Sequence, residues 1–174
     1  MLDIKLVITD CDGSLTDGTV FYDRNGPVGR RYSAFDGKGF ERLLKQNIDV
    51  MIITQSSEES ALDIIKRAER FQIDAHTGVD DKKEFISKLI KENYSDVGWE
   101  HIAYFGDDIN DLDSMFLCPI VGCPETAHVS VKDYIKYRMA RDWRSAFISV
   151  RNGGEGAFRD FADFILTLER QKIQ

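Results

Sequence analysis

Carboxylate side chains gather at two points of the sequence, and each group follows a short apolar run. Asp10 and Asp12 come directly after the run Leu6–Thr9. A second acidic group follows the run Ile102–Phe105 and consists of Asp107, Asp108 and Asp111. Carboxylates held about 4 Å apart repel by roughly 4 kcal/mol at an intermediate dielectric, and a divalent cation relieves that repulsion. Oxygen ligands together with several waters suit Mg²⁺, so the two groups predict a magnesium site.

Two further polar residues are expected at the same place. Thr54 ends the apolar run Val50–Ile53, and Lys82 lies near the start of an amphipathic segment. Ligands of a parallel sheet bind at the carboxyl ends of the strands, so all these residues should meet at one rim. Each feature is ordinary by itself, because an Asp-x-Asp after a strand is often only a turn and a helix cap. Their coincidence at one rim is what predicts an active site.

The segments that must position these residues alternate between strand and helix. Short apolar runs predict strands at residues 6–9, 50–53, 75–77, 102–105, 119–122 and 147–150. Apolar residues at helical spacing predict helices within residues 40–44, 61–68, 85–90, 112–116 and 158–168. This order predicts an α/β fold, a three-layer Rossmann-like parallel sheet, in a single domain over residues 1–174.

Two local features complete the expected fold. Residues 21–32 predict a small β-hairpin flap, with Asn25 and Gly26 as its turn. Ser56 and Ser57 are expected to cap the second helix, because Glu59 follows Ser56 by three residues.

The overall charge excludes some classes of partner. The chain has 23 Lys and Arg against 30 Asp and Glu, a formal net charge of −7, which argues against general binding to nucleic acid or membrane surfaces. Its three cysteines have no paired spacing that would predict disulfides or zinc. No run approaches 18 apolar residues, and the N-terminal residues have no signal-peptide layout. We therefore expect a cytoplasmic protein.

The acidic groups and the residues between them resemble a known family. Asp10–Gly18, Thr54, Lys82 and Gly106–Asp111 resemble the four motifs of the haloacid dehalogenase superfamily. The chain is most similar to the branch without a cap domain that includes phosphatases of 3-deoxy-D-manno-octulosonate 8-phosphate and of nonulosonate 9-phosphates. The resemblance covers nearly the whole chain, and it extends to the hairpin, Asp36–Gly39 and Gly153–Ala157.

The resemblance implies a magnesium-dependent phosphatase acting on a sugar or sugar-acid phosphate. Asp10 would attack phosphorus, and Asp12 would act as general acid and then general base. Mg²⁺ would be held by the Asp10 carboxylate, the Asp12 backbone carbonyl and Asp107.

The resemblance implies roles for further residues as well. Thr54 and Lys82 would contact the phosphoryl oxygens. Asp108 and Asp111 would orient Lys82 or the metal ligands without contacting the substrate themselves. Substrate contacts are expected from Asp36, Gly37, Lys38 and Arg30.

The chain departs from this branch at the positions of its arginines. Octulosonate 8-phosphate phosphatases usually carry arginines that can hold the substrate's carboxylate, and the corresponding positions here are Phe35, Glu41, Ser56 and Ile64. We therefore expect weak use of octulosonate 8-phosphate relative to another phosphorylated sugar or sugar acid. The segment between Cys123 and Phe147 is longer than in the branch and basic, which indicates either a solvated helix face or a replacement anion site.

The resemblance also implies an assembly, and two other functions stay open. Relatives of this branch form tetramers in which the flaps pack together, so the apolar content of the flap predicts a homotetramer. Residues Gly153–Ala157 would then approach a neighbour's active site. One alternative is a catalytically idle oligomerisation module, and the other is a receiver-like domain that accepts a phosphoryl group. A receiver domain, however, takes its phospho-aspartate from the end of a middle strand, where this chain has Thr54.

Overall fold

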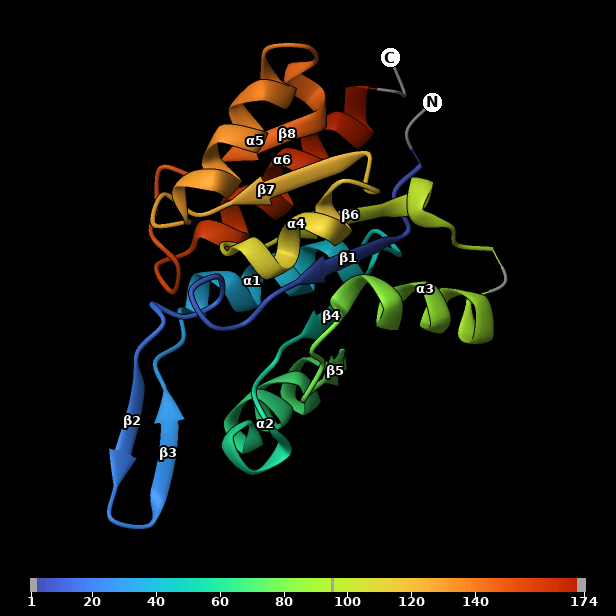
Figure 1. Ribbon diagram of the computed structural model, residues 1–174. Helices are drawn as coiled ribbons and strands as arrows, with labels where there is room; N and C mark the ends of the chain where they lie inside the picture. Colours follow the sequence, from blue (N-terminus) through green and yellow to red (C-terminus); the bar gives the residue numbers. More distant parts are fainter. Residues whose placement is uncertain (1–2, 95, 172–174) are drawn as a thin grey trace.

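Six parallel strands form the central sheet, in the order β5-β4-β1-β6-β7-β8 (Figure 1). The structure, a computed structural model, describes residues 3–94 and 96–171. The strands are β1 Leu6–Thr9, β4 Asp49–Ile53, β5 Asp74–His76, β6 Ile102–Phe105, β7 Ile120–Cys123 and β8 Ala146–Ile148. Every neighbouring pair in this sheet is parallel. The predicted α/β class is confirmed, although the ends of the predicted domain lie outside the described residues.

Helices cover both faces of the sheet. One layer contains α1 Ala34–Leu44, α2 Leu62–Phe71 and α6 Ala157–Gln171, and the other contains α3 Lys82–Asn93, α4 Ile109–Met115 and α5 Val129–Met139. Single turns of 3₁₀ helix lie at η1 Glu58–Ser60, η2 Trp99–His101 and η3 Trp143–Ser145. The sequence did not predict α5, because Val131 and Ile135 are its only buried residues and its apolar pattern is weak. No helix in the described part of the chain is long and apolar enough to cross a membrane.

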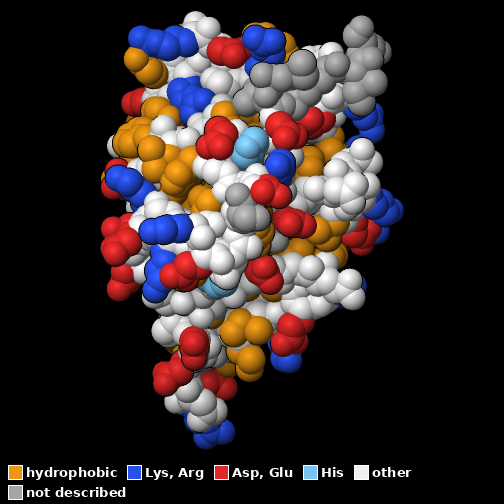
Figure 2. Space-filling view, turned by 90° about the vertical axis from the view of Figure 1, so that its right-hand side faces the viewer, with side chains coloured by type: hydrophobic (Ala, Val, Ile, Leu, Met, Phe, Trp, Pro, Cys, Tyr) orange, Lys and Arg blue, Asp and Glu red, His pale blue; other side chains and the backbone are white. Residues whose placement is uncertain are grey.

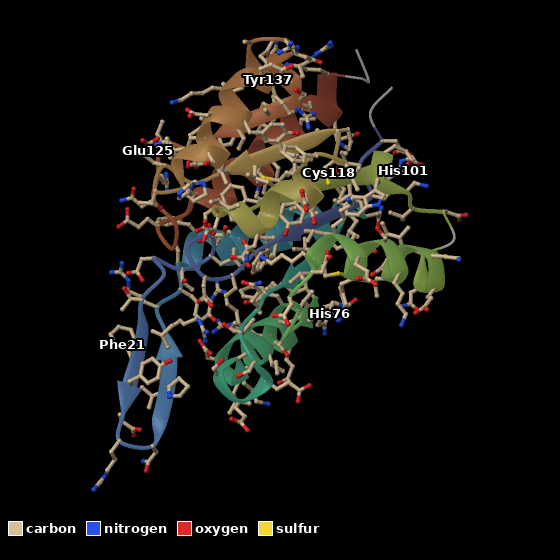
Figure 3. All side chains as sticks on the ribbon, in the orientation of Figure 1. Phe21, His76, His101, Cys118, Glu125 and Tyr137 are labelled. Atoms are coloured by element: carbon tan, nitrogen blue, oxygen red, sulfur yellow. The ribbon has the colours of Figure 1, made fainter. Side chains whose placement is uncertain are left out.

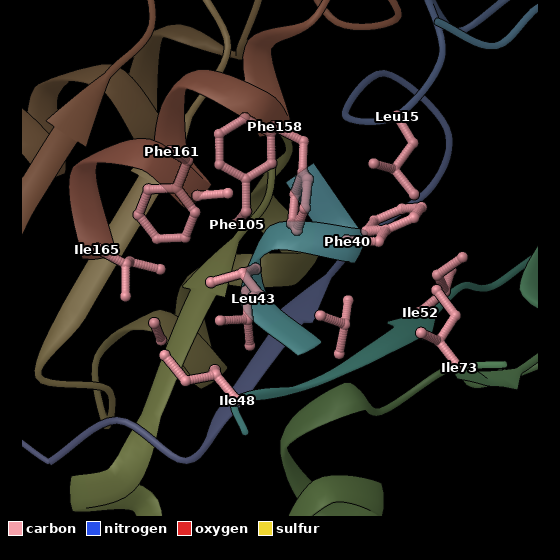
Figure 4. Close-up of a cluster of buried hydrophobic side chains, with 14 of the residues drawn as sticks. Leu15, Phe40, Leu43, Ile48, Ile52, Ile73, Phe105, Phe158, Phe161 and Ile165 are labelled. Atoms are coloured by element: carbon pink, nitrogen blue, oxygen red, sulfur yellow. The ribbon is translucent and has the colours of Figure 1, made fainter. Parts of the chain in front are cut away.

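Alternate strand residues enter the two cores. Val7 and Phe105 face α1, α2 and α6, whereas Ile8 and Tyr104 face the opposite layer. Aromatic rings fill the first core (Figure 4), where Phe105 and Phe158 meet edge to face with their centroids 5.7 Å apart. Burying such a side chain stabilises the fold by about 1.5–3 kcal/mol. Both cores fix the strands, and hence the positions of the loops at their carboxyl ends.

The flap is a separate two-stranded hairpin that projects from the body (Figure 1). It pairs β2 Val20–Asp23 with β3 Gly26–Arg30 in antiparallel register. Its turn is Arg24–Asn25, one residue earlier than predicted, because the Asp23 carboxylate accepts the Asn25 N–H at 2.7 Å and closes the turn there.

The predicted cap of the second helix is wrong. Ser57 precedes the 3₁₀ turn η1 and makes no side-chain capping bond, and α2 begins only at Leu62. Ser56 donates its hydroxyl instead to Asp12, 44 residues earlier in the sequence. A long-range contact to the loop after β1 has therefore replaced a local cap at this serine.

Candidate active site

Lys82 connects two of the predicted acidic residues at the carboxyl rim of the sheet. Its Nζ lies 2.6 Å from Asp10 Oδ1 and 2.7 Å from Asp111 Oδ1. Burial opposes the charge of this side chain, but attraction to Asp10 and Asp111 outweighs burial and raises the pKa of Lys82. Lysine has three N–H donors and two of them are engaged by these carboxylates, so one is left for a phosphoryl oxygen.

Asp111 holds Lys82 and the loop after β6 at the same time. Its Oδ1 accepts from Lys82 and from the Tyr104 hydroxyl at 2.8 Å. Its Oδ2 accepts the backbone N–H groups of Asp107 at 3.0 Å and Asp108 at 3.2 Å. Both oxygens are thus occupied by protein donors. The Asp108 side chain caps α4 by accepting from the Ile109 N–H, so it helps to shape the same loop.

Asp10 and Asp107 are the carboxylates best placed to hold a cation. Carboxylate oxygens of Asp10, Asp107 and Asp111 lie within 4.8 Å of one another. Burial raises the pKa of Asp10, although Lys82 opposes this rise, and burial followed by the charges of Asp10 and Asp111 raises the pKa of Asp107. Because Asp111 already accepts four hydrogen bonds, Asp10 and Asp107 remain as ligands, and an all-oxygen donor set of this kind fits Mg²⁺.

Asp107 is oriented from the loop after β1. The Ser14 hydroxyl donates to Asp107 Oδ1 at 2.8 Å. The backbone of that loop is itself covered by the tail, because a Cβ at Gly153 would overlap the carbonyl oxygens of Gly13 and Thr16. Gly153, which was expected near a neighbouring subunit, therefore packs against the loop after β1 of its own chain.

The Asp12 carboxylate is bound by the flap and by the loop after β4. It accepts from Arg30 Nε at 2.5 Å and from the Ser56 hydroxyl at 2.7 Å. Its side chain is 31% exposed, so one side stays open to a ligand. Thr54 is buried at the end of β4, and its hydroxyl oxygen accepts the Ser56 N–H at 3.2 Å.

Three of the four expected substrate contacts lie on α1, away from the carboxylate cluster. Asp36 is fully buried and accepts the Arg159 N–H at 3.0 Å, so it has no surface to offer a substrate. Gly37 is needed for packing, because a Cβ there would overlap the Phe71 ring. Lys38 is exposed and pairs with Glu41 at 2.7 Å. The role of Asp36 is thus corrected to a structural one.

A cavity beside Lys38 contains cations that the sequence analysis missed. It has a volume of about 510 Å³ between α1 and α2, and its lining includes Lys38, Arg67 and Arg70. The Arg67 guanidinium lies 4.5 Å from the centroid of the Tyr32 ring, which forms part of the wall. Tyr32 follows the flap strands and does not belong to them. Spacing in the sequence could have pointed to Arg67. It lies one helical turn after Ile64, the position where the family's arginine was expected.

Basic side chains in the segment after β7 bind to groups nearby in the same chain. Lys132 pairs with Glu125 at 2.7 Å, and Arg138 donates to the carbonyl oxygens of Cys118 and Pro119. Arg144 pairs with its neighbour Asp142, and Arg141 stacks on Tyr137. These contacts favour the solvated helix face over a replacement anion site.

Comparisons with known proteins agree with this geometry. No family model matches the chain. The 3-deoxy-D-manno-octulosonate 8-phosphate phosphatase KdsC of Haemophilus influenzae is 33% identical over 171 residues, covering 94% of this chain and 83% of that protein.

Two solved structures have the same fold. The cobalt-bound form of the octulosonate 8-phosphate phosphatase from Haemophilus influenzae has a TM-score of 0.80 at 30% identity, covering 95% of this chain and 88% of that one. The Moraxella catarrhalis enzyme in complex with magnesium, phosphate and KDO has a TM-score of 0.80 at 28% identity, covering 94% and 86%. From the sequence relationship, the shared fold and the acidic rim together, the chain belongs to the KdsC-type phosphatases of the haloacid dehalogenase superfamily.

Proposed function

We propose that this chain hydrolyses the phosphomonoester of a sugar or sugar acid through a phospho-aspartyl intermediate on Asp10. The observation that carries the proposal is the buried Lys82, held between Asp10 and Asp111 beside Asp107. A nucleophilic carboxylate, a fixed cation and a set of metal ligands thus share one rim. Membership of a phosphatase family favours catalysis over an idle module or a receiver-like domain.

The proposed reaction has two displacements. An Asp10 oxygen attacks phosphorus, the bond from phosphorus to the sugar oxygen breaks, and Asp12 gives that oxygen a proton. Water then attacks phosphorus with Asp12 accepting its proton, which releases inorganic phosphate and restores Asp10. Lys82 and Thr54 would stabilise the charge on the phosphoryl oxygens during both steps.

The site residues would hold one Mg²⁺ through the Asp10 carboxylate, the Asp107 carboxylate and the Asp12 backbone carbonyl. When bound, the ion supplies positive charge that neutralises the phosphoryl oxygens and the carboxylates around them. Ser14 keeps Asp107 in place for this role by donating to its Oδ1.

Octulosonate 8-phosphate or a nonulosonate 9-phosphate fits the proposed substrate class. The names of the relatives specify the first of these, which opposes the weak use of octulosonate 8-phosphate expected from the missing arginines. A sugar acid needs a cation for its carboxylate, and the cavity lined by Lys38, Arg67 and Arg70 offers several. Tyr32 links this cavity to Asp12, because its hydroxyl donates to Asp63 at 3.0 Å and Asp63 pairs with Arg30, which binds Asp12.

The setting of the enzyme is also part of the proposal. We infer one domain over residues 1–174, because both helical layers pack on the same sheet. Cys11, Cys118 and Cys123 are free and buried, which suits the reducing cytoplasm. On the face shown in Figure 2, acidic and basic side chains are interspersed, so this face has no basic patch for nucleic acid.

The test is turnover of a panel of phosphate esters with and without Mg²⁺. We expect magnesium-dependent release of phosphate from octulosonate 8-phosphate or a nonulosonate 9-phosphate, with lower kcat/KM for neutral sugar phosphates. Asp10→Asn should abolish turnover while the folded protein remains, as judged by its circular dichroism. Near wild-type turnover by Asp10→Asn would refute the mechanism, and preference for neutral sugars would refute the substrate class.

A further inference from the structure

The Arg30 side chain extends from the flap to Asp12 in the loop after β1. It is the last residue of β3, yet its side chain is only 2% exposed. Its Nε and Nη2 donate to the two carboxylate oxygens of Asp12, at 2.5 Å and 3.2 Å. The planar guanidinium thus grips one carboxylate with two parallel donors, an arrangement that fixes the carboxylate's rotation.

The remaining donors of Arg30 are also engaged. Its Nη1 donates to Asp63 Oδ1 at 2.8 Å and to the Ser60 carbonyl oxygen at 2.7 Å. Its Nη2 makes a second bond to the Ser56 hydroxyl at 2.9 Å. A guanidinium has five N–H donors, and these contacts use all five. Arg30 therefore has no donor left for a substrate carboxylate, although the sequence suggested that role.

Ser56 closes the arrangement from the loop after β4. Its hydroxyl accepts from Arg30 and donates to Asp12 Oδ2 at 2.7 Å. Asp12 is thus held by a residue of the flap and by a residue of the loop after Thr54. Its exposed side remains open, so the contacts orient the carboxyl group without covering it.

We propose that Arg30 is a positioning residue that aims the Asp12 carboxyl group at the leaving oxygen of the substrate, with Ser56 as its partner. The inference rests on the proposed role of Asp12 as general acid. It assigns to the flap a part in the chemistry, because the orientation of Asp12 depends on where β3 ends.

The chemistry of the leaving group gives this role a distinctive signature. A sugar alkoxide is strongly basic and leaves only when it receives a proton, whereas p-nitrophenolate leaves without one. General acid help is worth typically about 10²–10⁴-fold. A misplaced Asp12 should therefore slow cleavage of a sugar phosphate far more than formation of the phospho-enzyme from p-nitrophenyl phosphate.

The experiment compares Arg30→Gln, Arg30→Lys, Ser56→Ala and Asp12→Asn on both substrates. For p-nitrophenyl phosphate the pre-steady-state burst is measured, because it reports phospho-enzyme formation alone. We expect Arg30→Gln to lower kcat for the sugar phosphate by about 10²-fold, with less than tenfold loss of burst rate and little change in KM. Arg30→Lys should recover only part of the loss, because lysine cannot grip both oxygens. Arg31→Gln is the matched control, since Arg31 is the exposed neighbour and pairs with Asp17.

A double-mutant cycle tests whether Arg30 acts through Asp12. In the Asp12→Asn background, Arg30→Gln should cause less than a threefold further loss on the sugar phosphate. Multiplicative losses, equal losses on both substrates, or a loss confined to KM would each overturn the inference. If Asp12→Asn itself shows no dependence on the leaving group, the proposed acid role fails instead. Should Arg30→Gln not fold, Ser56→Ala carries the same cycle with Asp12→Asn.

Discussion

Lys82 has the most demanding environment of any single residue in the site. Its ammonium is enclosed, and it balances two carboxylates that are themselves removed from water. A buried ion pair adds little net stability compared with an apolar substitute, but removal of one partner is costly because it leaves a buried charge unpaired. Lys82 therefore supports the fold and the proposed chemistry through the same contacts.

Lys82→Met should lower the free energy of unfolding by roughly 3–5 kcal/mol. The reason is that Asp10 and Asp111 would remain buried without their cation. Urea denaturation measures the loss, and Lys83→Met, a substitution at an exposed lysine on the same helix, is the control. Mg²⁺ should restore more stability to Lys82→Met than it adds to the wild type. Equal stability of the two variants would contradict this account.

The residues that could be predicted from the sequence are those at the ends of strands. Asp10, Thr54 and Asp107 were found because an apolar run marks each strand and its end marks the rim. Arg30 contacts Asp12 because the hairpin folds back toward the loop after β1, and no local sequence pattern predicts that contact. For the same reason Asp36 was misassigned: its place in a motif did not reveal that α6 buries it.

At the scale of elements, Asp36 joins two helices of one layer. It lies in the first turn of α1 and accepts the N–H of Arg159 in the first turn of α6. Its other oxygen, Oδ2, has no partner within the described residues. Burial raises the pKa of Asp36 from 3.8 to about 6, against the opposing effects of its backbone hydrogen bonds and Arg67, while Asp160 adds to the rise.

This raised pKa predicts a pH dependence of stability. Between pH 4 and pH 6 the folded state binds more protons than the unfolded state, so the contribution of Asp36 to stability falls as the pH rises. Asp36→Asn should remove this dependence, and the difference in unfolding free energy between the two proteins should change by up to about 3 kcal/mol across the window. Urea denaturation at several pH values measures it, with Asp113→Asn as control because Asp113 is exposed on α4. Parallel pH curves for wild type and Asp36→Asn would show that the carboxyl group is not perturbed.

The elements themselves were largely predictable because their apolar patterns are strong. All six sheet strands fall within a residue or two of the expected ranges. For β1, β4, β6 and β7 the reason is that a strand buried on both faces is a nearly continuous apolar run. The start of α2 was not predictable. Ser56 lies in a sequence typical of a helix cap, but its hydroxyl donates to Asp12 instead. The helix α5 was missed because only Val131 and Ile135 are buried on it, so its apolar pattern is weak.

At the scale of the whole molecule, the flap is the part whose apolar side chains are left exposed in a single chain. Phe21, Tyr22 and Val28 are 51%, 70% and 60% exposed on a two-stranded hairpin. Figure 3 shows Phe21 on the flap, well away from Tyr137 and His101 at other ends of the molecule. A lone hairpin is at best marginally stable in water, and exposed apolar side chains that are close together indicate an interface. The flap is therefore the expected contact between subunits.

We predict that the protein is a homotetramer held by its flaps. Light scattering at micromolar concentration should give the mass of four chains of 19.9 kDa each. The double substitution Phe21→Ser with Val28→Ser should shift the mass toward smaller species, because it removes apolar surface from the hairpin. Phe116→Ser is the control, since Phe116 is similarly exposed but lies at the end of α4, and it should leave the tetramer intact. Because β3 ends at Arg30, the dissociated protein should also lose activity toward the sugar phosphate more than toward p-nitrophenyl phosphate. A fully active wild-type monomer would show that the flap serves another purpose.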